Sequence, residues 1–297
     1  YPDKKNIVFI SAYDEHGKKI KKKIKIKTDK VEIDMPKVKI LKKDQEKLKK
    51  GFLFISSFSG MYAIDLNGDV RWYIKDGIGG TSPITQLEND RFLAINNEMT
   101  RPPYYKSGFY ELNIMGKVHK EYDVDGVHHD IVELPNKNYI ALINNPDGDL
   151  EDYMVEINRE TGRVVKRWNM KEIFNIKEKI ARPEYINYDL MTNKEKENKV
   201  LEEKIVSKYK EDWFHQNAVW YDKDTNYLII SSRHQNAVIA IDYNSSEVKW
   251  IFGGEKYEWN EKRDLTNKIL KPNSSDFDYA YGQHGVKLID GLLYVYD

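Results

Sequence analysis

Four segments of the chain repeat one plan, and this repeat predicts an all-β fold of the β-propeller type, preceded by a small N-terminal β-sandwich-like domain. Each segment reads as a short strand, a polar turn rich in Asn, Asp, Pro or Gly, and a second, more apolar strand. The segments are residues 82–96, 129–143, 216–230 and 284–296. Aromatic residues make up 12% of the chain, with 21 tyrosines, and such a composition suits strands around a packed core.

A second hairpin follows each of the first three segments, so each unit has the four strands of a propeller blade. These hairpins begin at Phe109, Tyr153 and Val238. A partial copy at residues 62–72 precedes them, and the fourth segment starts a further blade. A propeller closes into a ring, because an open edge strand stays unpaired. We therefore expect the natural protein to continue beyond Asp297, completing the open blade and adding about two more.

Residues 1–48 lack the blade plan and are predicted to form a separate N-terminal β domain, with the incomplete propeller over residues 49–297. Within the first domain, residues 6–13, 21–27 and 30–35 alternate apolar and polar side chains. Such alternation places the apolar side chains on one face of a sheet and the lysines in water. Because acidic residues are interleaved, we interpret the lysines as a solvated face rather than as a polyanion-binding patch.

The composition argues against several classes of function. Lys+Arg and Asp+Glu number 48 each, so no net charge points to nucleic acid or to an anionic membrane surface. No stretch approaches about 18 apolar residues, so no membrane span is predicted. Without cysteine, the chain has no disulfide, thiolate metal site or cysteine nucleophile. Two insertions interrupt the repeat: residues 170–210 are charged and helix-favouring, and residues 254–280 are polar and aromatic.

One rim of the predicted propeller gathers residues that can bind an anion or move a proton. In a four-stranded blade, the start of the innermost strand and the end of the second strand lie on the same face, near the axis. Six side chains fall at such positions: His128, His129, His215, Asn217, Arg233 and His284. The remaining histidines are expected elsewhere: His16, His119 and His234.

The repeat alignment divides the four rim histidines into two registers. His128 and His215 are equivalent, each just before an innermost strand, and His129 and His284 are equivalent one residue further on. Adjacent residues of a strand point in opposite directions, so His128 and His129 are not both expected to face the axis. The alignment leaves open which of the two does so.

Several histidines together first suggest a metal ion such as zinc. Acidic residues are scarce at the predicted rim positions, Asp130 being the main candidate, and the Arg233 guanidinium would repel a cation and prefers a tetrahedral oxyanion. We therefore predict neither a metal nor another cofactor. The sequence also lacks the Ser/His/Asp order of acyl transfer, a Gly-rich phosphate loop and a Walker lysine.

Histidine, arginine and asparagine suit the transfer of a charged tetrahedral group. One neutral imidazole attacks the central atom and becomes covalently modified. The other side chains hold the three outer oxygens, over which charge is spread in a loose transition state. A sulfuryl group carries less charge than a phosphoryl group, so it tolerates the lack of a metal better.

Four motifs, taken together and in this order, resemble the bacterial arylsulfate sulfotransferases. They are residues 128–135, 212–219, 231–235 and 283–288. The resemblance runs from about residue 50 to the end of the chain, and the three strands before it fit the family's small N-terminal β domain. It implies a six-bladed propeller enzyme that moves a sulfuryl group from a phenolic sulfate ester to another phenol, without a nucleotide sulfate donor. The implied route is ping-pong through a sulfated histidine.

The resemblance also implies roles for the rim residues. His284 would be the nucleophile, in the Gln-His motif. The sulfate ligands would be His215, Asn217 and Arg233, with one more from the pair His128 and His129, for which the alignment with His215 favours His128. A hydroxyl ligand of the family would lie past Asp297, and a disulfide found near the site in some members cannot form in this chain. We expect a periplasmic or extracellular protein of the bacterial cell envelope, with phenolic substrates, no nucleic-acid partner and a homodimer allowed.

Three other interpretations stay open. The propeller could carry a hydrolase, either a sulfatase or a phosphatase, or it could bind partners on its rim without catalysis. It could also carry a metal-dependent enzyme. Five aromatic residues in and after the second insertion fit a phenol pocket and fit ordinary loop packing equally well: Tyr257, Trp259, Phe277, Tyr279 and Tyr281.

Overall fold

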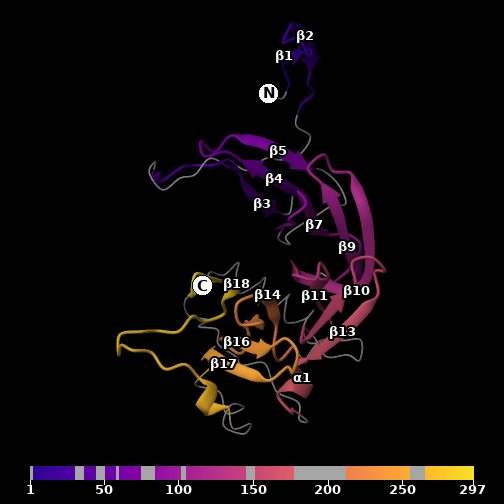
Figure 1. The fold of residues 1–297 in the computed structure, drawn as a ribbon. Coiled ribbons are helices and arrows are strands. Elements are labelled where there is room, and N and C mark those ends of the chain that lie inside the picture. Colours follow the sequence, from indigo (N-terminus) through magenta and orange to yellow (C-terminus); the bar gives the residue numbers. More distant parts are fainter. Residues whose placement is uncertain are drawn as a thin grey trace. The chain divides into compact units, whose positions relative to one another are not determined.

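The chain divides into two compact units, residues 1–76 and residues 77–297, in the computed structural model. The structure describes residues 3–30, 37–44, 51–57, 60–74, 84–101, 105–144, 151–176, 212–254 and 265–297. Almost every element among these residues is a strand, which confirms the predicted all-β class (Figure 1). The domain boundary predicted after residue 48 stays a prediction.

Unit 1 begins with an antiparallel hairpin of β1 (Lys5–Tyr13) and β2 (Lys19–Lys27). The Asp14 carboxylate accepts two backbone amide hydrogen bonds and so closes the turn between them. The alternating pattern predicted a covered apolar face, yet Phe9 is 67% exposed and its apolar neighbours are exposed as well. Residues 31–36, which hold nearly all of the third predicted strand, lie outside the described residues, and the β-sandwich-like arrangement stays a prediction.

The rest of unit 1 is a three-stranded antiparallel sheet of β3 (Leu53–Ser57), β4 (Gly60–Ile64) and β5 (Val70–Ile74), in that order. Strands β4 and β5 contain the partial blade copy predicted at residues 62–72. Their turn is stabilised by the Asp65 carboxylate, which accepts two backbone amide hydrogen bonds and pairs with Arg71. The partial copy is therefore a hairpin, as predicted, with one strand more than the repeat had indicated.

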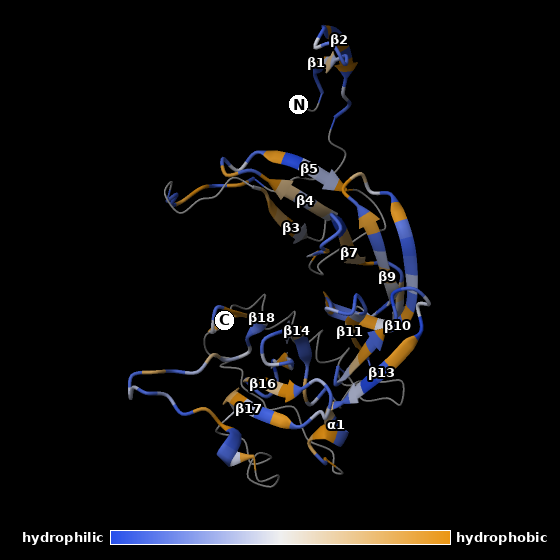
Figure 2. Ribbon diagram, in the orientation of Figure 1, coloured by the Kyte–Doolittle hydropathy of each residue, from blue (hydrophilic) through white to orange (hydrophobic). Residues whose placement is uncertain are grey.

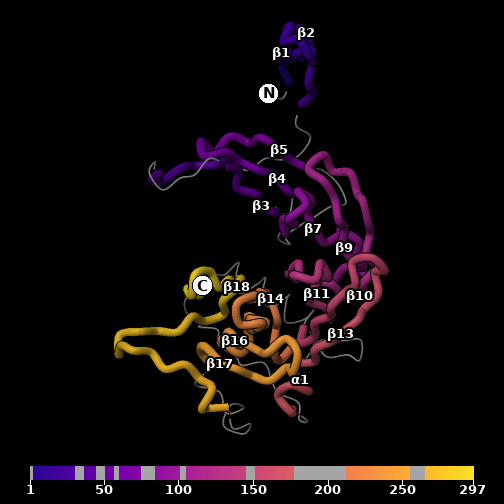
Figure 3. Tube along the Cα trace, viewed as in Figure 1, coloured from indigo at the N-terminus to yellow at the C-terminus, as the bar shows by residue number. Residues whose placement is uncertain are grey.

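Unit 2 opens with an eight-stranded antiparallel sheet in the order β13-β12-β11-β10-β9-β7-β6, with β8 paired to β9. Its strands are β6 (Thr85–Gln86), β7 (Arg91–Ile95), β8 (Met99–Arg101), β9 (Tyr105–Asn113), β10 (Val118–Glu133), β11 (Tyr139–Ile143), β12 (Tyr153–Ile157) and β13 (Val164–Asn169). The sheet contains two consecutive blades of the predicted repeat, and Figure 3 follows the chain from one to the next.

The two blades are joined because β10, with 16 residues, belongs to both. Its first part pairs with β9 and its last part pairs with β11, and the register shifts between Asp123 and Val127 and again between Val127 and Ile131. Gly126 lies at the first shift with φ of 85°, a conformation that side chains oppose. The repeat had predicted two separate strands here. No insertion separates the blades at this point, so the strand continues through a bend.

The next blade is the four-stranded sheet of β14 (Gln216–Asp222), β15 (Tyr227–Ser232), β16 (Ala237–Asp242) and β17 (Val248–Gly253). A two-stranded sheet of β18 (His284–Ile289) and β19 (Leu292–Tyr296) follows it. The described part of the first insertion begins with a short helix, α1 (Met170–Ile173), and residues 177–211 lie outside the described residues. A 3-10 helix, η2 (Thr266–Lys268), lies in the second insertion.

The core of unit 2 lies between consecutive blades. Its largest cluster packs the blade of β11–β13 against the blade of β14–β17, with Leu142, Met154 and Trp168 on one side and Val219 and Ile239 on the other. A further cluster packs β14–β16 against β18. The apolar stretches of these strands are visible in Figure 2. Face-to-face packing of successive four-stranded sheets is the arrangement of propeller blades, as the repeat predicted. Within the described residues, no helix is long and apolar enough to cross a membrane.

Candidate active site

The inner strands of three successive blades bring the predicted rim together. Strand β10 contacts β14, and β14 contacts β18. Each inner strand has a register shift near its first core position, where one extra residue in β14 and β18, and two in β10, interrupt the pairing with the second strand of the blade. Such β-bulges bend a strand and re-aim its side chains. The residues at these bulges form the candidate site.

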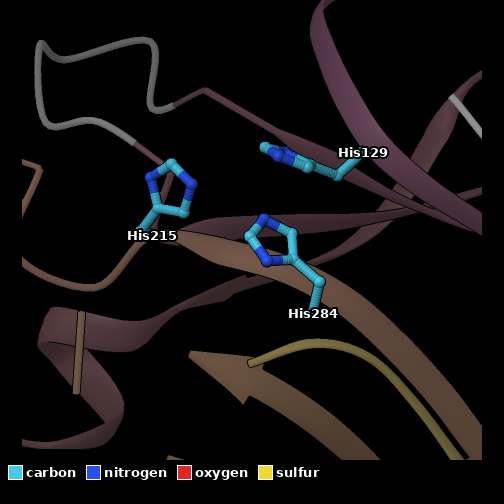
Figure 4. Close-up of side chains that lie close together, drawn as sticks. All are labelled: His129, His215 and His284. Carbon is cyan, nitrogen blue, oxygen red and sulfur yellow. The ribbon is translucent and has the colours of Figure 1, made fainter. Parts of the chain in front are cut away.

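Three histidines converge there: His129 of β10, His215 directly before β14, and His284 at the start of β18. The ring centroid of His129 lies 5.4 Å from that of His215 and 6.1 Å from that of His284. The centroids of His215 and His284 are 6.4 Å apart. One nitrogen of each ring lies within 4.8 Å of the other two. Figure 4 shows the three rings turned toward one another. We call these residues the histidine trio.

His128 stands behind the trio instead of belonging to it. Its ring is 1% exposed, its Nδ1 lies 2.9 Å from Nδ1 of His129, and it packs edge-on against Tyr105. The repeat alignment had favoured His128 over His129 as the residue equivalent to His215. The geometry places His129 in the trio and His128 behind it.

The backbone explains why His129, and not the aligned His128, lies in the trio. The core registers do agree, since Ile131, Ala218 and Val286 each resume the pairing after the bulge. The left-handed residue does not fall at the same place: φ is 51° at His129 and 50° at His215, which is one position earlier in the repeat. Left-handed conformations are uncommon away from glycine and cluster at functional sites. One such residue redirects the side chains next to it.

Two carboxylates hold His215. Its Nδ1 lies 2.6 Å from Oδ2 of Asp212 and 2.9 Å from Oε2 of Glu151. Glu151 also accepts a 2.9 Å hydrogen bond from the Tyr105 hydroxyl. Burial alone would lower the pKa of His215, but the charges of Glu151 and Asp212 raise it to about 10. His215 is therefore an imidazolium at neutral pH.

The sequence did not point to these two carboxylates, and His234 was predicted to lie away from the site. Asp130, the predicted acidic candidate, instead accepts backbone hydrogen bonds from Ile131 and Val219, which ties β10 to β14. His234 was expected elsewhere, yet its ring stacks 4.5 Å from that of His215, and its Nδ1 lies 2.7 Å from the backbone oxygen of Asp212. The prediction that acidic residues are scarce at the rim was wrong.

Arg233 and Asn217 border the trio. The backbone amide of Arg233 donates a hydrogen bond to the His215 carbonyl, and the guanidinium Nη1 of Arg233 lies 3.5 Å from Nε2 of His234. The Asn217 amide nitrogen donates to the Gln283 carbonyl at 2.7 Å, directly before His284, while its buried Oδ1 has no hydrogen-bond partner within the described part of the chain. Asn217 therefore joins β14 to β18 at the trio.

The histidines of the site differ in charge. Burial lowers the pKa of His128 and lowers that of His129 well below its usual range. Partial desolvation of the His284 ring within the site lowers its pKa, with further lowering by the positive charges of Arg233 and His215. His129 and His284 are thus neutral beside a protonated His215. Environments that separate the pKa values of neighbouring groups are typical of acid, base and nucleophile assignments.

The spacing of the trio would by itself also suit a metal ion, since zinc takes three histidine nitrogens. The charges fit an anion better. His215 already holds a proton between two carboxylates, and the Arg233 charge that depresses protonation of His284 would repel a cation in the same way. This distribution of charge suits negative oxygens next to an unprotonated imidazole.

The aromatic residues of the second insertion give a mixed result. Phe277 and Tyr279 pack edge-on against each other and against Phe252 of β17, as loop packing would have them. Tyr281 is 49% exposed and lies three residues before His284 in the chain. Tyr257 and Trp259 lie outside the described residues.

Comparison with known proteins agrees with this geometry. The family model of the arylsulfotransferases (ASST) matches residues 37–297. The chain belongs to the arylsulfotransferase family. The arylsulfate sulfotransferases AssT of Escherichia coli O6:H1 and of Lelliottia amnigena are each 24% identical to it over 280 residues. These matches cover 80% of this chain and 46% of each relative, so the chain spans about half the length of these relatives.

Solved structures with a similar chain path are more distant. A streptogramin B lyase covers 82% of this chain at 11% identity, with 61% of its own chain matched and a TM-score of 0.43. The β-propeller domain of Cps50 (Swd1) from Myceliophteria thermophila also covers 82% of this chain, at 12% identity, with 59% of its own chain matched and a TM-score of 0.39.

Proposed function

We propose that this chain carries the sulfuryl-transfer site of an arylsulfate sulfotransferase. The observation that supports the proposal is the histidine trio, in which neutral His284 faces protonated His215, with Arg233 beside both. A neutral imidazole is a nucleophile, and the two cations offer hydrogen bonds to the oxygens of a sulfate ester. The substrates would be a phenolic sulfate donor and a phenol acceptor, and the reaction would need no cofactor.

The reaction would run in two half-reactions. In the first, the lone pair of a His284 nitrogen forms a bond to sulfur, the bond between sulfur and the aryl oxygen breaks, and a phenolate leaves with that electron pair. In the second, an acceptor phenolate attacks the sulfur of sulfohistidine, and the bond between sulfur and nitrogen breaks. Protons of both phenols exchange with water. His215, Arg233, Asn217 and His129 would hold the sulfuryl oxygens in both steps.

The test uses the complete protein with 4-nitrophenyl sulfate and a phenol acceptor. Release of 4-nitrophenolate should depend on acceptor concentration, and parallel lines in double-reciprocal plots would support the ping-pong route. Mass spectrometry of the protein quenched with donor alone should find a sulfuryl group on His284. Release that is independent of the acceptor would mean a hydrolase instead.

Replacing His284 tests the nucleophile directly. His284→Ala should lower kcat by roughly 10³-fold or more, because the covalent route is lost. The fold should remain, since the residue is exposed at the start of β18. The matched control is His119→Ala, an exposed histidine of β10 outside the trio, which should keep normal turnover. Retained activity in His284→Ala would overturn the assignment.

A further inference from the structure

Two carboxylates from different blades, the buried Glu151 and the partly buried Asp212, meet at one nitrogen of His215. We propose that Glu151 and Asp212 are positioning residues that hold the His215 ring, with its positive charge, against the transferred sulfuryl group. This inference rests on the proposed function of the site, and it assigns a role to two residues that act through His215.

The contacts fix the state of His215 at one nitrogen. Ionised carboxylates only accept hydrogen bonds, so the Nδ1 that lies 2.6 Å from Asp212 and 2.9 Å from Glu151 must carry a hydrogen. Two negative groups beside a neutral ring would be an uncompensated buried charge. An imidazolium balances them in part. Its Nε2 then carries the second hydrogen and is the nitrogen left to face His129 and His284 (Figure 4).

Both carboxylates are themselves held. Glu151 is 1% exposed, and the Tyr105 hydroxyl donates to its other oxygen at 2.9 Å. His234 lies 3.4 Å from Oδ2 of Asp212 through Nδ1. Glu151 lies two residues before the blade strand β12, and Asp212 lies four residues before β14, so the two carboxylates that hold His215 come from different blades. A ring held from both sides cannot turn away from the trio without breaking one of these contacts.

Through His215, Glu151 and Asp212 also affect the proposed nucleophile, His284. The titratable and charged groups around His215 are Glu151, Asp212, His128, His129, His234, Arg233 and His284. Positive charge on His215 disfavours a proton on His284, which keeps that ring unprotonated for attack. The two carboxylates thus set the donor state of one ring and, through it, the nucleophilic state of another.

The first test reads His215 without any turnover. Glu151→Gln, Asp212→Asn and the double variant are made in the complete protein, and the ring of His215 is followed by NMR of ¹⁵N-labelled histidine, assigned with His215→Gln. In the unchanged protein, His215 should stay protonated from pH 6 to about 9, because its opposing charges are permanent there. In the double variant it should lose its proton below about pH 7. An unchanged titration in the double variant, or a neutral His215 at pH 7.5 in the unchanged protein, would overturn the inference.

The second test separates positioning from mere structure. At pH 8.5, kcat of the double variant should fall by roughly 10²-fold, as for loss of a preorganised donor. At pH 6 the loss should shrink, because acid restores the proton to His215. A purely structural defect would lower kcat equally at both pH values, and that result would contradict the inference.

The matched control is Glu156→Gln, which neutralises a buried carboxylate that accepts hydrogen bonds from Tyr243 and two asparagines and contacts no histidine among the described residues. Its pH profile should be that of the unchanged protein. If the unchanged protein transfers no sulfuryl group at any pH, the proposed function fails while the NMR result still decides the state of His215.

Discussion

Two buried glutamates of unit 2, Glu111 and Glu151, occupy similar surroundings with different partners. Their exposed fractions are 2% and 1%, and each accepts a hydrogen bond from a tyrosine hydroxyl, that of Tyr139 at 3.0 Å or that of Tyr105 at 2.9 Å. The partners of opposite charge differ. Glu111 forms ion pairs with two arginines, whereas Glu151 lies among histidines and forms its ion pair with His215.

The difference lies in whether the partner can lose its charge. Arg91 and Arg159 bind Glu111 at 2.7 Å and 2.6 Å, and arginine stays protonated at every ordinary pH. Burial would raise the pKa of Glu111, but the two arginines lower it to about 2. His215 can be neutralised, so the Glu151 pair is conditional. Glu111 and its two arginines, whose charges are permanent, form a network that joins the strands of β9–β12; we call it the permanent network. The ion pair of Glu151 and His215 depends on a proton and lies at the histidine trio; we call it the conditional network.

Breaking the permanent network should give the largest change in stability. Glu111→Ala leaves two guanidinium groups without their buried partner, and we expect the free energy of unfolding to fall by about 3–5 kcal/mol. Urea unfolding measures it, while kcat of the folded fraction should be unchanged. Glu133→Ala is the control, because its contact with Arg159 is longer, at 3.7 Å, and should matter by less than about 1 kcal/mol. A loss of activity in folded Glu111→Ala would erase the distinction between the two glutamates.

The ion pair of Glu151 and His215 should lose its stabilising effect in alkaline solution. The folded pKa of His215, about 10, lies above its unfolded value of 6.5, so its stabilisation is full below pH 6.5 and is lost as pH rises toward 10. The difference in unfolding free energy between the unchanged protein and His215→Gln should therefore shrink by up to about 1.4 kcal/mol per pH unit over that window.

Arg159→Gln supplies the comparison for this measurement. The stabilisation by Glu111 is present above pH 4.5 and is lost only as pH falls toward 2, so the corresponding difference should stay level between pH 7 and pH 10. Two parallel curves would mean that His215 carries no proton in the folded protein.

The smallest expected effects come from the two tyrosines. Tyr105→Phe and Tyr139→Phe each remove one hydroxyl that donates to a buried glutamate, and each should cost about 1 kcal/mol in thermal or urea unfolding. Only Tyr105→Phe should also lower kcat, by a few-fold, because it loosens Glu151. Equal kcat values for the two variants would show that the hydrogen bond from Tyr105 to Glu151 has no effect on the histidine trio.

Local patterns predicted the fold better than they predicted the site. Strand pairs and turns follow from nearby residues, and so the blades fell where the repeat placed them. The choice between His128 and His129 depended on a single left-handed residue, which no alternation rule encodes. Asp212 could have been found, since it lies in the same motif as His215, three residues earlier. Glu151 gave no such signal, because only the packing of two blades brings it to that ring.

The continuous strand β10 affects how easily the residues of the site unfold locally. His129 belongs to a strand hydrogen-bonded to both β9 and β11, so freeing it means breaking two blades at once. His284 begins a hairpin whose strand β19 exposes Leu292, Tyr294 and Tyr296 by half or more. Amide hydrogen exchange should therefore be faster around His284 than around His129, since local unfolding costs less where fewer contacts must break. The trio therefore joins a histidine on a strand shared by two blades to a histidine on the first strand of a single hairpin.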